Sequence, residues 1–166
     1  MKPFIAVLSL LGTASAVDVA MYQSSNCKGG FLVCRGLSPH VCCASGIIFA
    51  SAIPSNVPQG SVVRAYKGIC AGISPGPDLR PSICNDVTGY NFTSVMAITA
   101  GISKKRAAGP AATPAECVRP DTLVLGDGTA YDLTGLSDGD FENLTEAALG
   151  ADRSADVPSK LEALQI

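Results

Sequence analysis

The sequence predicts a small all-β domain, a sandwich or barrel, stabilised by disulfides. The front half of the chain after its first 16 residues, residues 17–106, contains short apolar stretches separated by Gly and Pro. None of these stretches has the 3.6-residue period of a helix. The 166-residue chain has seven cysteines, 5% aromatic residues and no Trp. A domain with so few large apolar side chains needs cross-links in addition to its core.

The first residues predict export from the cell. A short basic start, Met1-Lys2-Pro3, precedes the apolar residues 4–11, and Ala14-Ser15-Ala16 supplies the small residues that signal peptidase recognises. We therefore expect residues 1–16 to be a signal peptide that is cleaved after Ala16. The apolar run is shorter than the roughly 20 residues that span a bilayer, so we expect a secreted, extracellular protein with no transmembrane segment.

Four stretches between residues 17 and 103 have the composition of strands: residues 17–22, 46–53, 60–66 and 94–99. The second of these is expected to end before Pro54, and the third follows a turn cluster at residues 58–60. Residues 17–103 are therefore expected to form the cysteine-rich β domain.

Cysteine spacing predicts disulfides rather than a metal site. Six cysteines lie before residue 104 and can pair completely: Cys27, Cys34, Cys42, Cys43, Cys70 and Cys84. The sequence does not choose among their fifteen pairings, but adjacent cysteines rarely bond to each other, so Cys42 and Cys43 should have different partners. Cys117 is left over, and its state stays open. No Cys-x-x-Cys spacing occurs, so no zinc site is expected. We also expect no other metal and no cofactor.

Charge divides the mature chain. Residues 17–106 hold eight basic and three acidic residues, a net charge of +5, whereas residues 107–166 hold three basic and eleven acidic residues, a net charge of −8. Such asymmetry suggests separate units. At the boundary, Lys104-Lys105-Arg106 resembles a cleavage site of subtilisin-like convertases, although three solvated charges at the end of a strand are the alternative. Residues 104–120 are interpreted as this site and a linker.

Residues 121–166 are expected to form a small acidic segment. Residues 122–133 predict a hairpin with Asp127-Gly128 at its turn. A short helix is expected to begin after Asp138 or Asp140 and to stop at Gly150. The segment is either a propeptide that neutralises the basic front half or a solvated acidic tail. Asn91 and Asn143 begin glycosylation sequons.

The front half also contains a loose internal repeat of Tyr, Cys-x-Gly, Cys and Ser before an apolar strand. Its two copies are Tyr22, Cys27, Gly29, Cys34, Ser45 and Tyr66, Cys70, Gly72, Cys84, Ser94. This order resembles the βγ-crystallin Greek-key motif, and the chain resembles fungal small secreted cysteine-rich proteins with such a domain. The resemblance implies a Greek-key sandwich in which each Ser hydroxyl ties a loop to a folded hairpin.

The calcium site of microbial βγ-crystallins is not expected here. In that family two Asn or Asp residues precede a Ser/Thr-Ser pair. Gly89 and Tyr90 occupy these positions before Thr93-Ser94, and calcium requires several oxygen ligands.

No catalytic pattern stands out in the sequence. His40 lies beside Pro39 in an expected loop, and no nucleophile elbow or phosphate loop occurs. The net charge of −2 argues against a nucleic-acid partner. We expect a secreted non-catalytic protein, of effector, toxin or antimicrobial type, that binds wall polysaccharide, membrane or a host protein. A structural extracellular or cell-wall protein with a permanent acidic tail is one alternative, and a small secreted enzyme is the other.

Overall fold

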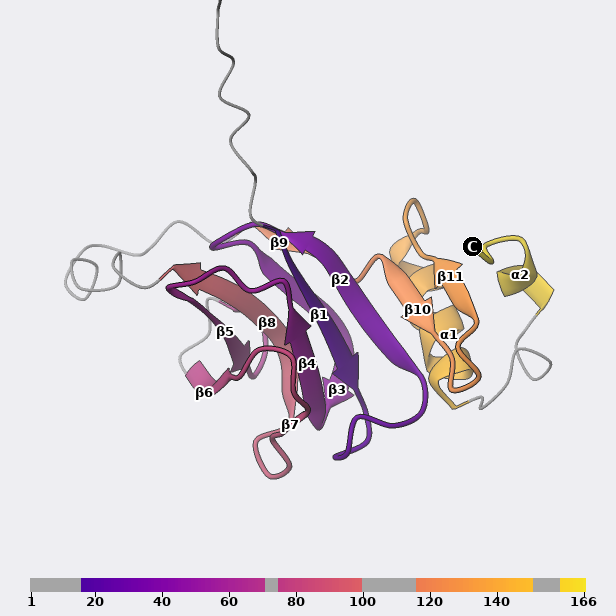
Figure 1. The fold of residues 1–166 in the computed structure, drawn as a ribbon. Helices are drawn as coiled ribbons and strands as arrows, with labels where there is room; N and C mark the ends of the chain where they lie inside the picture. Colours follow the sequence, from indigo (N-terminus) through magenta and orange to yellow (C-terminus); the bar gives the residue numbers. More distant parts are fainter. Residues whose placement is uncertain (1–15, 71–74, 100–115, 151–158) are drawn as a thin grey trace, which may run out of the picture.

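A computed structural model describes residues 16–70, 75–99, 116–150 and 159–166. Two sheets pack face to face as a sandwich, as expected, and the described chain is mostly β with a helix toward its C-terminal end (Figure 1). One sheet contains β1 (Val17–Tyr22), β2 (Phe31–Leu37), β4 (Ser51–Ser55), β7 (Asn85–Asp86), β10 (Thr122–Val124) and β11 (Ala130–Asp132). The other contains β3 (Cys42–Phe49), β5 (Ser61–Tyr66), β6 (Pro75–Leu79), β8 (Phe92–Thr99) and β9 (Cys117–Val118).

The single strand expected at residues 46–53 is wrong, because the chain changes sheets there. β3 ends at Phe49 in one sheet, and β4 begins at Ser51 in the other. Pro54 lies inside β4, opposite Val19, rather than ending the strand. β7 pairs only with Ser51 and Ala52, so no described strand lies outside Pro54 and its missing N–H is tolerated.

Strands β1–β4 and β5–β8 form two successive sets with the same arrangement. The sheets have the orders β11-β10-β2-β1-β4-β7 and β6-β5-β8-β3-β9. The first, second and fourth strands of each set therefore lie together, and the third strand joins the sheet of the other set. This exchange of β3 and β7 makes the two sets interdependent, and it gives the repeat seen in the sequence a structural basis.

Two buried serines hold the equivalent hairpins of these sets. The Ser51 hydroxyl donates to the Ser24 carbonyl at 2.5 Å, and the Ser94 hydroxyl donates to the Gly68 carbonyl at 2.5 Å. Each carbonyl belongs to the residue two positions after the repeat's tyrosine. The role expected of Ser94 therefore agrees with its bond. The expectation for Ser45 is wrong, since among the described residues its hydroxyl bonds only with the nearby Ile47 backbone.

The acidic segment packs onto the sandwich and contributes to the same core. The expected hairpin is β10–β11, and β10 pairs antiparallel with β2. Helix α1 (Asp138–Leu149) begins after the N-cap Ser137, so neither expected cap, Asp138 or Asp140, is the N-cap. Helix α2 (Ser159–Glu162) is a short turn of helix. One buried cluster joins the sandwich interior to the following residues of this segment: Leu123, Leu125, Tyr131, Leu133, Phe141, Leu144 and Ala148.

The sequence predicted that residues 104–120 divide the chain into two units, but one sheet contains strands from both sides of this stretch. Lys104, Lys105 and Arg106 lie outside the described residues, and the division stays a prediction about processing. Within the described residues, the sheet runs from β7 through β2 to β11 without a break. Residues 117–132 therefore contribute strands to the same two sheets as the cysteine-rich part.

Candidate functional site

Three disulfides hold the loops and strands of the sandwich. They join Cys27 to Cys84, Cys34 to Cys43, and Cys42 to Cys70. The neighbours Cys42 and Cys43 thus bond to different partners, as expected. The Cys34–Cys43 bond connects β2 to β3 and hence one sheet to the other.

The other two disulfides occupy equivalent positions in the two strand sets. Cys27 follows β1 and bonds to Cys84, which precedes β7, while Cys70 follows β5 and bonds to Cys42 in β3. Each bond ties the hairpin of one set to the strand that the other set contributes. Cys117 is exposed on β9, opposite Cys42, and takes no part in the three disulfides.

The Cys27–Cys84 bond brings two exposed loops together. The Cα atoms of the two cysteines lie 5.9 Å apart, with Lys28 beside one and Ile83 beside the other. Ile83 is 46% exposed, and Arg80 is an exposed cation in the same loop. We call Lys28, Arg80 and Ile83 the disulfide loop surface.

Asn85 fixes the shape of this loop. Its amide donates to the carbonyls of Arg80 and Ile83, each at 2.9 Å, and its side-chain oxygen accepts from the Arg80 N–H at 2.8 Å. A third contact, at 3.2 Å, reaches the Ala52 carbonyl in β4. The loop is thus held to the sheet on one side and to Cys27 on the other, so its exposed side chains project from a rigid support.

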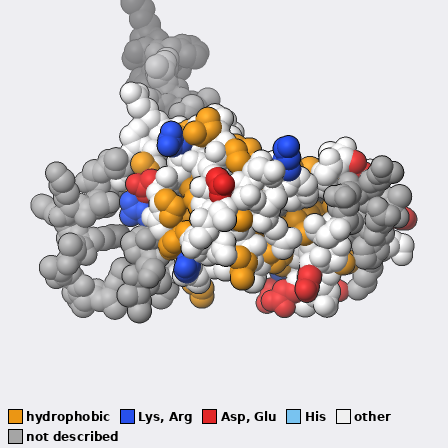
Figure 2. Space-filling model, turned by 90° about the horizontal axis from the view of Figure 1, so that it is seen from below, with side chains coloured by type: hydrophobic (Ala, Val, Ile, Leu, Met, Phe, Trp, Pro, Cys, Tyr) orange, Lys and Arg blue, Asp and Glu red, His pale blue; other side chains and the backbone are white. Residues whose placement is uncertain are grey.

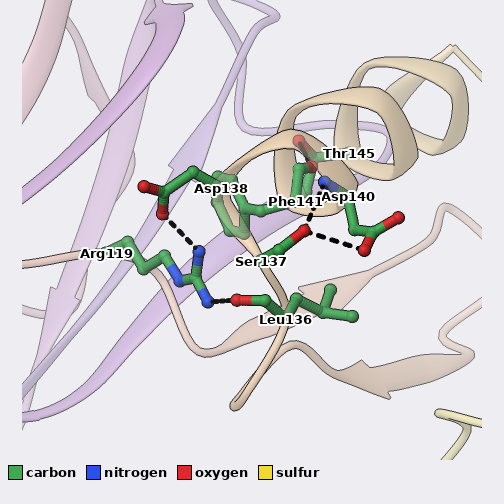
Figure 3. A network of polar contacts seen from close by, with 7 residues as sticks. All are labelled: Arg119, Leu136, Ser137, Asp138, Asp140, Phe141 and Thr145. Carbon is green, nitrogen blue, oxygen red and sulfur yellow. Dashed lines mark hydrogen bonds and ion pairs between the residues drawn. The ribbon is translucent and has the colours of Figure 1, made fainter.

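The one cation among residues 116–150 makes contacts within that stretch. These residues contain eight acidic residues and one basic residue, Arg119. Arg119 pairs with Asp138 at 2.9 Å, donates to the Leu136 carbonyl and lies over the Phe141 ring (Figure 3). These contacts hold the start of α1 against the preceding chain. The remaining carboxylates give this end of the molecule a negative charge.

A groove that the sequence analysis did not identify lies between β3 and α1. It has a volume of about 480 Å³ and is lined by Gln23, Gly46, Ile47, Ile48, Glu142 and Glu146. Acidic side chains (red) lie next to hydrophobic side chains (orange) on the face shown in Figure 2. The two glutamates are one helical turn apart. This spacing is visible in the sequence, but it does not predict a groove unless β3 is known to lie opposite the helix.

Several carboxylates near the sandwich bind backbone groups instead of forming an acid–base pair. Asp18 accepts from the Gly36 N–H at 2.8 Å, and Asp121 accepts from the Arg35 N–H at 2.9 Å. His40 occupies a turn with a φ of 66°, and its backbone N–H donates to the Ala97 carbonyl. Among the described residues, no three His, Cys, Asp or Glu side chains are grouped as metal ligands.

The expected processing and modification residues are only partly described. Residues 1–15 and 104–106 lie outside the described residues, whereas Ala16 directly precedes β1. Asn91 is exposed at a φ of 47°, and Asn143 is exposed on α1. Both sequon asparagines therefore face solvent.

The fold and cross-links define a disulfide-rich β-sandwich domain, which is typical of an oxidising, extracellular setting. Residues 18–121 match ARB_05566_N, a family described as an N-terminal domain. Because this match covers more than half of the chain, the chain belongs to that family. No curated protein and no solved structure matched the sequence. In the parts of the chain that the structure describes, no helix is long and apolar enough to cross a membrane.

Proposed function

We propose that this protein is a secreted, non-catalytic binding protein that acts at a cell surface, a wall or a host target, as an effector, toxin or antimicrobial protein does. The disulfide loop surface carries the proposal. It combines two exposed cations with an exposed aliphatic side chain on loops held by a disulfide and by Asn85. Rigid loops on a β scaffold commonly carry binding residues.

Absence of catalysis is part of the proposal. The bonds of Asp18 and Asp121 to backbone N–H groups favour a structural role for these carboxylates. General acid–base chemistry instead needs a carboxylate or His placed beside a substrate proton.

We further propose that the sandwich is βγ-crystallin-like. The support is the exchange of β3 and β7 between two four-strand sets, together with the equivalent bonds of Ser51 and Ser94. These features agree with the resemblance in the sequence, in which a serine ties each hairpin.

An anionic target suits the disulfide loop surface. Lys28 and Arg80 attract anionic polymer or lipid over a distance of about 8 Å at physiological ionic strength. Charges farther away than this length are screened, so the chain's net charge of −2 does not by itself prevent local attraction. Binding of this kind weakens as salt concentration rises.

Sedimentation of the purified secreted protein with wall polysaccharide, and with vesicles of phosphatidylcholine and phosphatidylserine, tests the proposal. We expect saturable, salt-sensitive binding to one of them. The Lys28→Gln/Arg80→Gln variant should bind less, whereas Arg35→Gln/Lys67→Gln, which removes the same charge elsewhere on the sandwich, should bind nearly as wild type. Hydrolysis of the bound polymer would instead support the enzyme alternative.

A structural protein with a permanent acidic module is the second candidate, and the pairing of β10 with β2 favours it. Cleavage after Arg106 would leave this pairing and the shared core intact. Mass spectrometry of the secreted protein, followed by gel filtration, distinguishes the cases. An intact chain, or two fragments that co-elute, supports the permanent module, and separated fragments support a propeptide.

A further inference from the structure

We propose that the groove between β3 and α1 binds an extended cationic segment of another extracellular protein. An aliphatic side chain of that segment would pack on Ile48, and a neighbouring Lys or Arg would lie between Glu142 and Glu146. This site shares no residue with the disulfide loop surface and takes a ligand of the opposite charge, so the inference goes beyond the proposed function.

The floor of the groove is an excursion of β3 away from its partner strand. Pairing with β8 steps from Ala44 opposite Ser94 to Phe49 opposite Phe92, so β3 uses five positions where β8 uses two. The Ser45 hydroxyl accepts from the Ile47 N–H at 3.2 Å and tightens the excursion. Bulges of this kind redirect side chains and are common beside functional sites.

The excursion places one isoleucine inward and the next outward. Ile47 is partly buried and packs against the core, whereas Ile48 is 60% exposed. An exposed large aliphatic side chain beside a groove gives a ligand a surface to desolvate, and burying it is favourable by roughly 25 cal/mol per Å².

The wall of the groove supplies the charge that selects the ligand. Glu142 and Glu146 are exposed neighbours on one face of α1, and the two described ion pairs are Arg64–Asp78 and Arg119–Asp138, neither of which involves them. Like charges at this spacing repel, so a cation placed between them relieves repulsion as well as forming new pairs.

The floor and wall lie close enough to act on one ligand. A Cβ built on Gly46 would lie 3.8 Å from the Glu142 carboxylate, so the excursion and the helix meet at ordinary contact distance. An anion is repelled here, and a bare metal ion would leave Ile48 unused. A segment that alternates cationic and aliphatic residues uses both features.

Fluorescence anisotropy with short labelled peptides tests the inference on the intact secreted protein. The probe has a Lys-Leu-Lys core flanked by Gly and Ser, and the matched peptides carry Glu-Leu-Glu or Lys-Ser-Lys. We expect the Lys-Leu-Lys peptide to bind most tightly. Glu142→Gln/Glu146→Gln should weaken it about fivefold or more, and Ile48→Ser should weaken it about tenfold.

Glu116→Gln/Glu162→Gln provides the control, because it removes two exposed carboxylates outside the groove and should change affinity less than about twofold. Equal weakening by both double variants, equal binding of the Lys-Ser-Lys peptide, or no peptide binding would overturn the inference. Calcium-induced stabilisation lost in Glu142→Gln/Glu146→Gln would also overturn it, in favour of an ion. Thermal unfolding confirms that each variant is folded.

Failure of this inference and failure of the proposed function give different results. The groove variants should leave sedimentation with polymer or vesicles unchanged, and Lys28→Gln/Arg80→Gln should leave peptide binding unchanged. Each surface is therefore tested by variants that do not alter the other.

Discussion

Leu123 on β10 lies directly opposite Leu32 on β2, and both side chains are fully buried. The family match ends at Asp121, so this contact joins the matched domain to the segment that follows it. β10 also covers an edge of the seven-residue strand β2, leaving the three-residue β11 outermost among the described strands. Long uncovered edges promote association between sheets, so the acidic segment protects the sandwich as well as adding charge.

Leu123→Ala should destabilise the whole protein by about 3 kcal/mol, because it removes buried methyl groups and leaves a cavity. Urea unfolding followed by far-UV circular dichroism and by tyrosine fluorescence should give one shared transition at lower urea. Val118→Ala, at an exposed position of β9, should change the stability by less than about 0.5 kcal/mol. Two separate transitions would mean that the acidic segment unfolds independently.

Both equivalent serines should contribute to stability, Ser51 more than Ser94. Ser51→Ala leaves the half-buried Ser24 carbonyl and the Cys27 N–H without their hydroxyl partner, and should cost about 1–3 kcal/mol in the free energy of unfolding. Ser94→Ala removes one of two hydroxyl donors to the Gly68 carbonyl, because Thr93 also donates to it at 3.1 Å, and should cost about 1 kcal/mol.

Ser45→Ala is the matched control for the serine variants, because its hydroxyl bonds only within its own turn. It should cost less than about 0.5 kcal/mol in chemical denaturation. A Ser45 effect as large as that of Ser51 would contradict the assignment of Ser51 to the repeat.

Local patterns predicted much of the fold. Alternation identified β5 and β8, and Asp127-Gly128 identified the β10–β11 turn. The expected helix agrees with α1, with an N-cap one residue before Asp138 or three before Asp140, and with its stop at Gly150. These features depend on residues close together in the chain. The Cys-Cys pair also predicted two different partners by local geometry alone.

Ser45 shows where local reasoning failed. The distance from Tyr22 to Ser51 is 29 positions and that from Tyr66 to Ser94 is 28, so the true repeat is more regular than the predicted one. The β3 excursion and the change of sheets at Ala50 separate Ser45 from the hairpin. Neither feature produces a periodic pattern in the sequence, so neither could be predicted from it. The pairing of β10 with β2 and the β3–α1 groove could not be predicted either, because they depend on contacts between segments that are distant in the chain.

Removing the Cys27–Cys84 bond should destabilise the protein strongly. Little packing should be lost, because Cys84 is exposed. The bond closes a separation of 57 residues, and restriction of the unfolded chain on that scale contributes about 4 kcal/mol. Cys27→Ser/Cys84→Ser should therefore unfold at much lower urea under non-reducing conditions. Cys117→Ser, exposed and outside the three disulfides, is the control, and a loss in the double variant no larger than in this control would refute the prediction.

Two Asp–Thr turns should make the protein sensitive to acid. The hydroxyl and N–H of Thr88 donate to Asp86, those of Thr134 donate to Asp132, and these bonds lower the pKa of each carboxyl below its usual value of 3.8. Because the folded state favours the ionised form, this stabilisation is fully present above that value and is lost as the pH falls through the lowered pKa. Thr88→Val/Thr134→Val keeps both N–H donors but removes both hydroxyls, so its melting temperature should fall below that of wild type at about pH 7 and approach it at about pH 2. Thr99→Val is the control, because it makes the same change on β8, in the other sheet from both turns. Its difference in melting temperature from wild type should not vary with pH. If the difference for the double variant were also independent of pH, the role of the turns would be refuted.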